Sequence, residues 1–307
     1  MKVSVIGAGN VGASTAYFLA RMGLADVVMV DVVPGMPQAK AEDFRHAAQS
    51  EGIRVSISGT NDYADIAGSD VVVHTAGIAR KPGMDRMDLL KTNVGIARSA
   101  SEAIRTHAPD SVLVVVSNPL DVIAMVCLRE TGFPSARVVG MAGILDSTRF
   151  RYFIAEKLNV WPGDVQAMVL GGHGDSMVPL PRYTRVAGVP LSQLLDEGTI
   201  TRLSDRTRVG GGEIVKYLKT GSAYYAPAAS VARMVEAVLT GREIIAPASA
   251  YLQGEYGYRD LYLGVPVRLG TGGLKEILSL ELSDDEQAAL DKSVEAVKKG
   301  LADLASL

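Results

Sequence analysis

Near its start the chain contains the sequence Val3-Ser4-Val5-Ile6-Gly7-Ala8-Gly9-Asn10-Val11-Gly12, which is the strongest single indication of its fold. A short apolar strand at residues 3–6 runs into glycines with the spacing G-x-G-x-x-G, and residues 11–22 have the apolar spacing of a helix. Such glycines allow a tight turn and a close approach of the backbone to a pyrophosphate, while the helix N-terminus presents free N–H groups. The stretch therefore predicts a dinucleotide site.

An acidic residue supports this interpretation. Asp31 follows an apolar strand at residues 27–30, about twenty residues after the last glycine of the motif. An acid at this place accepts hydrogen bonds from a ribose diol and repels a 2′-phosphate, which favours NAD over NADP. The alternative is a glycine-rich turn with Asp31 as an ordinary loop residue, but strand, glycines, helix and acid occur in the order that a dinucleotide fold requires.

Short β-branched runs alternate with helical stretches through the first half of the chain. Strands are expected at residues 3–6, 27–30, 54–58, 70–75 and 112–116, and helices at residues 11–22, 37–50, 85–106 and 121–131. Apolar runs that alternate with helices are typical of a parallel sheet covered on both faces. The first half therefore predicts an α/β fold, a Rossmann doubly wound parallel sheet.

The pattern changes after about residue 139. Helices are expected after Asp146, around residues 213–218 and 226–239, and from a Ser283 cap to about residue 304; strands are expected at 165–170, 244–248 and 261–268, the last two antiparallel. This mixture predicts an NAD-binding domain at residues 1–140 and a second, α+β catalytic domain at residues 141–307. No linker rich in Pro, Gly or Ser separates them, so we expect a broad interface.

Composition excludes several classes of protein. The 307 residues are 48% hydrophobic and 21% charged, which suits a globular protein with a large core, and the net charge of −3 provides no basic field for nucleic acid. Cys127 is the only cysteine, so an internal disulfide is impossible and a reducing compartment fits. We find no apolar run of membrane-spanning length and no apolar signal region, and we expect a cytoplasmic protein without a membrane partner.

Further polar residues follow the predicted strands at their carboxyl ends, where a doubly wound sheet binds its ligands. Asn118 is a candidate for a hydrogen bond to substrate or cofactor, or for the cap of the helix that follows. Asn93 either contacts the cofactor or is a solvated helix residue. The candidate cofactor-binding residues are Gly7, Ala8, Gly9, Asn10, Val11, Gly12, Asp31, Thr75, Ala76, Gly77, Asn93, Val116, Ser117 and Asn118.

The candidate proton carrier is His173, in Gly171-Gly172-His173-Gly174-Asp175. Imidazole changes charge near neutrality, and the flanking glycines are expected to leave room for a substrate and to expose the ring. Asp146 is the best candidate for its orienting carboxylate, which would also raise the pKa of the histidine. Asp146 could instead cap a helix. His46, His74 and His107 have no such setting, although His74 ends a strand near the expected cofactor.

Three arginines supply local positive charge. Arg149 lies three residues after Asp146 on the same side of a helix, and its planar fork matches a carboxylate. Arg80 and Arg86 lie in a basic loop with a proline and a glycine, which can swing over a site and close. The alternative is a solvated charged loop. We find no cluster of His and Cys at metal-ligand spacing and expect no metal.

Taken together, these motifs resemble the lactate/malate dehydrogenase family over essentially the whole chain, and within it the malate dehydrogenases of lactate-dehydrogenase-like type found in bacteria. The resemblance implies that His173 is the general acid/base and that Asp146 orients it. It implies that Arg149 clamps the C1 carboxylate, that Arg86 polarises the reacting carbonyl, and that Asn118 and Asn93 contact the ligands. It also implies a cis Asn118-Pro119 bond and a homodimer or homotetramer, for which we expect interfaces at the first helices and around residues 150–170.

The resemblance also implies that Arg80 selects the substrate. Lactate-specific relatives typically carry glutamine at this place, whereas arginine supplies a second fork for the C4 carboxylate of malate or oxaloacetate. Ala223 stands where lactate enzymes commonly carry threonine. The resemblance therefore implies reversible NAD-dependent oxidation of (S)-malate, a small dicarboxylate, to oxaloacetate, a step of the tricarboxylic acid cycle.

Three alternatives remain open. A lactate dehydrogenase is the nearest, and Arg80 argues against it. A short-chain reductase requires a Tyr-x-x-x-Lys pair, and no tyrosine in the chain has a lysine four residues later. A non-catalytic nucleotide-sensing module would keep the glycine motif but would need none of Asp146, Arg149 and His173.

Overall fold

The computed structural model describes residues 1–78 and 86–307, except the side chain of Arg86. The interpretations of Arg80 and of the Arg86 side chain thus lie outside the described residues. Within them, nine strands form one sheet in the order β14-β13-β12-β6-β5-β4-β1-β2-β3. Six of these are parallel: β1 (Lys2–Ile6), β2 (Asp26–Val30), β3 (Ile57–Thr60), β4 (Val71–His74), β5 (Val112–Val115) and β6 (Val138–Gly140).

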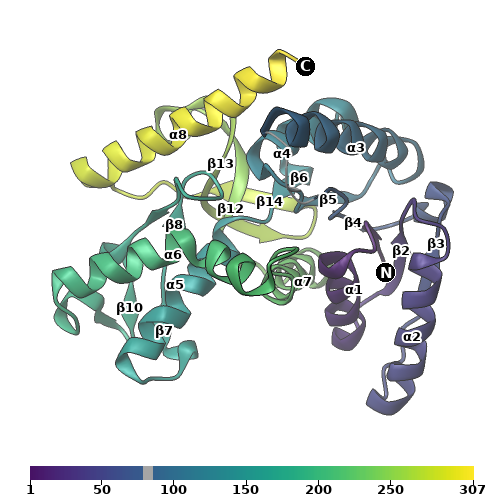
Figure 1. The fold of residues 1–307 in the computed structure, drawn as a ribbon, viewed down its shortest axis with the longest axis horizontal. Coiled ribbons are helices and arrows are strands. Elements are labelled where there is room, and N and C mark those ends of the chain that lie inside the picture. Colours follow the sequence, from purple (N-terminus) through teal and green to yellow (C-terminus); the bar gives the residue numbers. More distant parts are fainter. Residues whose placement is uncertain (79–85) are drawn as a thin grey trace.

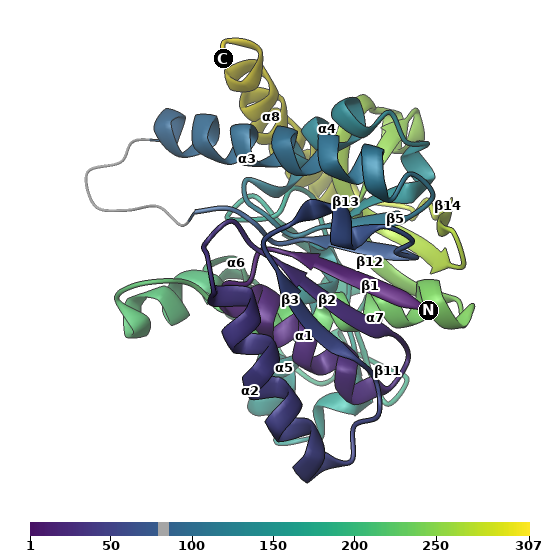
Figure 2. The same ribbon diagram turned by 90° about the vertical axis from the view of Figure 1, so that its right-hand side faces the viewer.

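The order of the parallel strands reverses direction between β1 and β4, which is the switch point of a doubly wound sheet. Helices cover both faces, with α1 and α2 on one side and α3 and α4 on the other (Figures 1 and 2). The predicted fold class is confirmed. These helices are α1 (Asn10–Met22), α2 (Met36–Glu51), α3 (Arg86–His107) and α4 (Leu120–Thr131).

The prediction for β3 was wrong by three residues at its start. The strand begins at Ile57 because its register follows β2, in which Val27 lies opposite Ile57 and Val30 opposite Thr60. Val55, which suggested an earlier start, packs against the core from outside the strand. Val55 is therefore apolar because it packs against the core, and not because it pairs with a neighbouring strand.

The second half extends the same sheet. β12 (Ile244–Gln253), β13 (Arg259–Gly270) and β14 (Gly273–Ile277) are antiparallel, and Ser249 of β12 pairs with Gly140 of β6. The antiparallel pair expected near residues 244–268 is confirmed, with longer strands. The helices of this half are α5 (Gly143–Leu158), α6 (Glu197–Leu218), α7 (Tyr225–Thr240) and α8 (Asp284–Ala305).

Two predictions in this half need correction. The strand expected at residues 165–170 is two strands in different sheets, because β7 (Val165–Gln166) pairs with β10 (Arg185–Val186) while β8 (Val169–Leu170) pairs with β9 (Val178–Pro179). The helix expected around residues 213–218 begins much earlier, at Glu197. Its buried face contains Thr199, Ser204, Thr207 and Gly210, which weaken the apolar pattern.

Short elements complete the described fold. β11 (Val189–Pro190) joins β10 and β7 in a small sheet. Short 3-10 helices lie at Tyr63–Ile66, Ser135–Arg137, Pro162–Asp164, Pro181–Tyr183, Leu191–Gln193 and Glu255–Gly257. The last helix begins as expected, because Ser283 and Glu286 form a capping box in front of α8.

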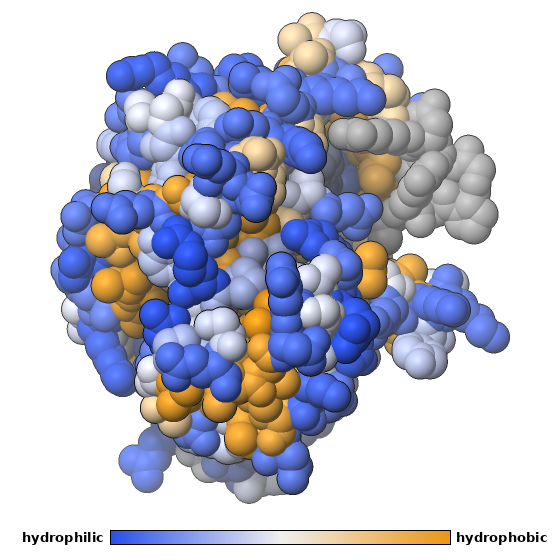
Figure 3. Space-filling model, turned by 90° about the vertical axis from the view of Figure 1, so that its left-hand side faces the viewer, coloured by the Kyte–Doolittle hydropathy of each residue, from blue (hydrophilic) through white to orange (hydrophobic). Residues whose placement is uncertain are grey.

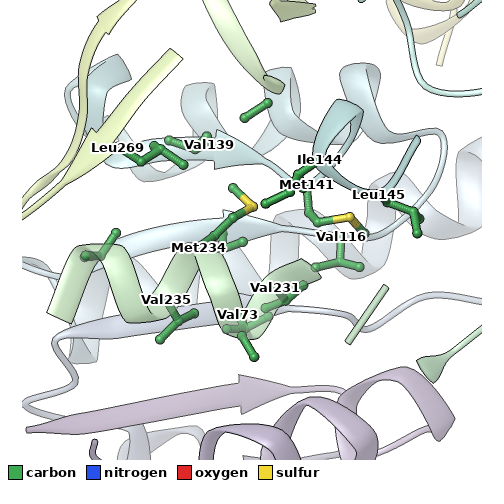
Figure 4. Close-up of a cluster of buried hydrophobic side chains, with 14 of the residues drawn as sticks. Val73, Val116, Val139, Met141, Ile144, Leu145, Val231, Met234, Val235 and Leu269 are labelled. Atoms are coloured by element: carbon green, nitrogen blue, oxygen red, sulfur yellow. The ribbon is translucent and has the colours of Figure 1, made fainter. Parts of the chain in front are cut away.

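The core joins the two halves. Val231, Met234 and Val235 of α7 point toward the main sheet, beside Val73 of β4 and Val139 of β6 (Figure 4). A helix from the second half therefore covers strands of the first, beside α1. This shared core accounts for the absence of a linker, because burial of the same apolar surface stabilises both halves.

The surface carries exposed hydrophobic side chains as well as charge. The face in Figure 3 is largely hydrophilic, with a hydrophobic area in its lower half. Among the exposed large hydrophobic side chains are Tyr152, Val160 and Trp161, of which Trp161 is 73% exposed. In the ranges 1–78 and 86–307, no helix combines the length and the apolar character needed to cross a membrane.

His74 is a buried imidazole in an apolar sheet. Alternation along β4 places its side chain on the face of Val72, under α3 and α4. Neither ring nitrogen has a hydrogen-bond partner within the described part of the chain. Burial lowers the pKa of His74 to about 4, so the ring stays neutral in the folded protein.

We expect His74→Val to protect the protein against acid. As pH falls from about 6.5 to about 4, the unfolded chain protonates His74 while the folded chain does not, so the native free energy of unfolding falls by about 3 kcal/mol from this group. Valine removes that loss. Urea denaturation at pH 7.5 and pH 5 measures the part lost by pH 5, about 2 kcal/mol, with the exposed His46→Ala as control. An unchanged pH dependence in His74→Val would contradict the assignment.

Candidate active site

The turn between β1 and α1 explains its three glycines. Gly7 has a φ of +99°, and a Cβ there would lie 2.6 Å from the Ala76 nitrogen; a Cβ on Gly12 would lie 1.8 Å from the Gly7 oxygen. These two glycines allow the turn to pack. A Cβ on Gly9, by contrast, would meet no atom within 4 Å, and no described side chain caps α1. The open backbone and uncapped N-terminus suit a dinucleotide pyrophosphate.

Asp31 directly follows β2 and holds this turn. Its Oδ2 accepts a hydrogen bond from the Ala8 N–H at 2.6 Å, and its Oδ1 accepts one from the Val33 N–H at 3.0 Å. A carboxylate has about four acceptor sites, so Asp31 retains capacity for a ribose hydroxyl. It also lines a cavity of about 630 Å³, together with Gly7, Gly9, Thr75, Ala76 and Gly77.

Two further cavities continue from this one. A cavity of about 440 Å³ shares Gly9, Thr75 and Gly77 with it and adds the residues Asn10, Val11, Gly12, Asn93, Val116, Ser117 and Asn118. A third, of about 230 Å³, shares Val11, Val116 and Asn118 with the second and reaches Arg149 and His173. The shared walls make one cleft from Asp31 to His173, which brings the two groups of candidate residues together.

Side-chain hydrogen bonds fix the strand ends beneath this cleft. Thr75 Oγ1 donates to the carbonyl oxygens of Ile6 and Gly7, each at 3.0 Å, and Ser117 Oγ donates to the Ala76 oxygen at 2.6 Å. These bonds tie β1, β4 and β5 to one another where the strands end. The strand-end polar residues therefore shape the cleft from below.

Asn93 is buried rather than solvated. Its Oδ1 accepts from the Ile78 N–H at 2.8 Å, and its Nδ2 donates to the oxygens of Ile78 and Asn118, at 3.2 and 2.8 Å. Asn118 does not cap the following helix, since Pro119 is the N-cap residue of α4. The Asn118-Pro119 bond is cis, which confirms that expectation. Asn93 thus links the chain after β4 to the chain after β5.

At the end of the cleft that contains His173, three side chains form a buried cluster. Asp146 Oδ2 lies 2.9 Å from His173 Nδ1, and its Oδ1 accepts from Arg149 Nη1 at 3.2 Å. Asp146 lies in the first turn of α5, whose N-cap residue is Ala142, so the capping interpretation of Asp146 was wrong. A carboxylate on Nδ1 directs the other ring nitrogen of His173 to carry or release the proton.

The same contacts set the charge of His173. Burial by itself disfavours the imidazolium, but the charge of Asp146 and its hydrogen bond outweigh burial and raise the pKa of His173 above its ordinary value. Arg149 acts in the opposite direction. Its Nε is buried and has no hydrogen-bond partner among the residues described.

The glycines around His173 have another purpose than the one expected. A Cβ on Gly171 would lie 2.6 Å from Ser293 Oγ, and one on Gly172 would lie 2.8 Å from Val297 Cγ2 and 3.3 Å from Asp121 Oδ2. The imidazole itself is only 15% exposed. Gly171 and Gly172 therefore let other side chains reach the loop, and only Gly174 faces open space.

Sequence reasoning missed some residues of this end. Arg208 of α6 lines the third cavity beside Arg149 and donates from Nε to the Met177 oxygen at 3.2 Å. Its segment has no distinctive motif, so no local signal identified it. Ala223, noticed only as a departure from lactate enzymes, lines the same cavity. Both positions depend on how α6 and the start of α7 fold over the cleft.

Two profiles of one protein family match almost the whole chain. Residues 1–140 match the profile described as lactate/malate dehydrogenase, NAD binding domain, and residues 144–306 match lactate/malate dehydrogenase, alpha/beta C-terminal domain. A malate dehydrogenase from Thermomicrobium roseum is 56% identical over 298 residues, which are 97% of this chain and 96% of that protein.

Solved structures of both enzyme types share the fold. The malate dehydrogenase from Salinibacter ruber has a TM-score of 0.96 at 49% identity, covering 100% of this chain and 98% of that chain. The lactate dehydrogenase from Cryptosporidium parvum, complexed with lactic acid and nicotinamide adenine dinucleotide, has a TM-score of 0.94 at 42% identity, covering 97% and 96%. The substrate must therefore be argued from the site, not from the fold.

Proposed function

The chain belongs to the lactate/malate dehydrogenase family and is an NAD-dependent enzyme, and on this premise we propose that it oxidises (S)-malate reversibly to oxaloacetate. One observation carries the proposal: the cleft that begins at Asp31 ends at the His173–Asp146–Arg149 cluster. A proton carrier and a carboxylate-binding fork thus lie at the far end of a dinucleotide-sized cleft. The relative from Thermomicrobium roseum supports the choice of malate by its name.

The first half of the cleft would hold the cofactor. The open backbone at Gly9 and the N-terminus of α1 would bind the pyrophosphate, and Asp31 would accept hydrogen bonds from a ribose. Thr75, Gly77, Asn93 and Ser117 line the path toward His173. When bound, NAD supplies the acceptor for the hydride that leaves C2 of malate.

The second half would handle the proton and the carboxylates. His173 takes the proton of the C2 hydroxyl in oxidation and returns it in reduction, while Asp146 holds the ring and stabilises its charged form. The guanidinium of Arg149, which lines the same cavity as His173, clamps the C1 carboxylate. Asn118 would contact both ligands, and Arg86 would stabilise the charge that develops on the reacting oxygen.

Arg80 would distinguish malate from lactate, and its replacement by glutamine tests the proposal. We expect native protein to oxidise NADH much faster with oxaloacetate than with pyruvate, because an unpaired Arg80 disfavours pyruvate. Arg80→Gln should lower the ratio of the two kcat/KM values at least about 100-fold, since a charged pair in a closed site contributes several kcal/mol.

The assay is NADH absorbance with each oxo acid, and Arg54→Gln, on the segment before β3, is the matched control. Equal or faster native turnover of pyruvate would move the assignment to lactate dehydrogenase and remove the role of Arg80. NADH binding without turnover of either acid would favour a nucleotide-sensing module.

Other parts of the proposal have different support. A homodimer or homotetramer agrees with exposed Tyr152, Val160 and Trp161 in the segment expected at an interface. The two profile matches support a division into residues 1–140 and 141–307. The free, buried Cys127 fits a reducing cytoplasm, where the reaction would serve the tricarboxylic acid cycle.

A further inference from the structure

Three consecutive N–H groups of the His173 loop bind to three different elements. The Gly171 N–H donates to the Gly264 oxygen of β13 at 2.8 Å, and the Gly172 N–H donates to Ser293 Oγ of α8 at 2.8 Å. The His173 N–H donates to Asp121 Oδ2 of α4 at 3.0 Å. Of these three hydrogen-bond acceptors, Asp121 is the one that binds the N–H of His173 itself.

Asp121 is a buried carboxylate whose two oxygens are both occupied. Its Oδ1 accepts from Ser249 Oγ of β12 at 2.7 Å, while its Oδ2 accepts the His173 N–H. Burial raises the pKa of Asp121, and these two hydrogen bonds oppose that effect. A buried carboxylate lowers the stability of the fold unless both of its oxygens accept hydrogen bonds, so Asp121 needs both of these partners.

The backbone at Gly172 leaves room for the Asp121 carboxylate to approach the His173 loop. A Cβ on Gly172 would lie 3.3 Å from Asp121 Oδ2, so a larger residue would crowd the carboxylate away from the loop. Asp121 belongs to α4 of the first half, while His173 and Ser249 belong to the second. The Ser249–Asp121–His173 chain of hydrogen bonds therefore crosses between the halves directly behind the proton carrier.

We propose that Asp121 is a positioning residue for the reaction, which holds the backbone of His173 at a fixed place relative to the cofactor-binding half. The inference rests on the proposed function. Asp146 orients the imidazole ring, and Asp121 fixes the point from which that ring projects. Hydride transfer needs alignment within a few tenths of an ångström, and a misplacement of about 1 Å can cost about 100-fold in rate.

Two substitutions of Asp121 separate the hydrogen bond from the charge. Asparagine is nearly isosteric, and its Oδ1 can accept the His173 N–H while its Nδ2 donates to Ser249 Oγ. Alanine provides no acceptor. We expect Asp121→Ala to lower kcat for oxaloacetate reduction about 10- to 100-fold with the KM for NADH changed less than about threefold, and Asp121→Asn to restore kcat to within about fivefold of native.

Amide hydrogen exchange tests the same inference without turnover. Exchange at His173, read from fragments covering residues 171–175, should accelerate at least about tenfold in Asp121→Ala and stay near native in Asp121→Asn. Native protein that turns over neither oxo acid would refute the proposed function, yet the exchange result would still decide the role of Asp121. Unchanged exchange in Asp121→Ala, or Asp121→Asn as impaired as Asp121→Ala, would overturn the inference.

A milder pair of variants covers the case in which Asp121→Ala does not fold. Ser249→Ala removes the support of Asp121 Oδ1, and Ser4→Ala removes a serine that is equally buried in a strand, where it bonds Ser69. Ser249→Ala should lower kcat about three- to tenfold and accelerate exchange at His173, whereas Ser4→Ala should do neither. Equal behaviour of the two variants would contradict the role of Asp121.

Discussion

Replacement of His173 by asparagine is expected to lower kcat for oxaloacetate reduction by about 10²- to 10⁴-fold, the usual contribution of a general acid/base. The Nδ2 of asparagine can occupy nearly the same place as the Nδ1 of histidine, but the amide carries no proton that titrates near neutrality. It can still donate to Asp146, so the buried carboxylate keeps a partner. The KM for NADH should change little, because His173 lies at the far end of the cleft from Asp31.

Steady-state kinetics with NADH and oxaloacetate measure this effect. His46→Asn is the control, since the His46 side chain is 75% exposed and lies on α2. A loss shared by both variants would reflect a general defect. A His173→Asn protein with native kcat would show that another group transfers the proton.

Replacement of Arg149 by lysine is expected to raise the KM for oxaloacetate by about 100-fold, which corresponds to about 3 kcal/mol of binding free energy. Lysine keeps the positive charge but presents a point charge instead of a planar fork. It therefore cannot bind the C1 carboxylate with two parallel hydrogen bonds while it also pairs with Asp146. The KM for NADH should be unaffected.

Arg206→Lys is the matched control for Arg149→Lys. Arg206 pairs with Glu156 and Glu213 at the exposed surface of α6, so its replacement should leave both KM values near native. An unchanged KM for oxaloacetate in Arg149→Lys would place the carboxylate clamp elsewhere, and Arg208 in the same cavity would be the next candidate.

The parallel half of the fold was predictable because its signals are local. The strand before Gly7, the glycine turn and the acid after β2 follow one another in the order that the fold requires, and each can be recognised within its own stretch of sequence, although Gly7 packs against Ala76 and Asp31 accepts from Ala8. The division into β7 and β8 was not predictable, because two neighbouring pairs of residues join different sheets, each according to the strand with which it pairs. The start of α6 was hidden because its buried face mixes the apolar Ile200 and Leu203 with Thr199, Ser204, Thr207 and Gly210.

The candidate site divides in the same way. His173, Asp146 and Arg149 could be proposed from residue type and motif, and the direction of the His173 pKa followed from the expected carboxylate. The purpose of Gly171 and Gly172 was misjudged, because the side chains that require them, Ser293 and Asp121, lie far away in the sequence.

The amino-acid sequence was enough to indicate the main chemical groups of this protein and the local structure that carries them: a glycine turn for a dinucleotide, an acid after β2, and a histidine in a glycine loop. The folded structure was needed to show that one cleft joins the first group to the last and that Asp121 and Ser249 support the backbone of His173. The difference lies in how far apart in the sequence the interacting residues are. Turns and helix starts are set by neighbouring residues, whereas a buried carboxylate finds its partners only after strands and helices from both halves have packed.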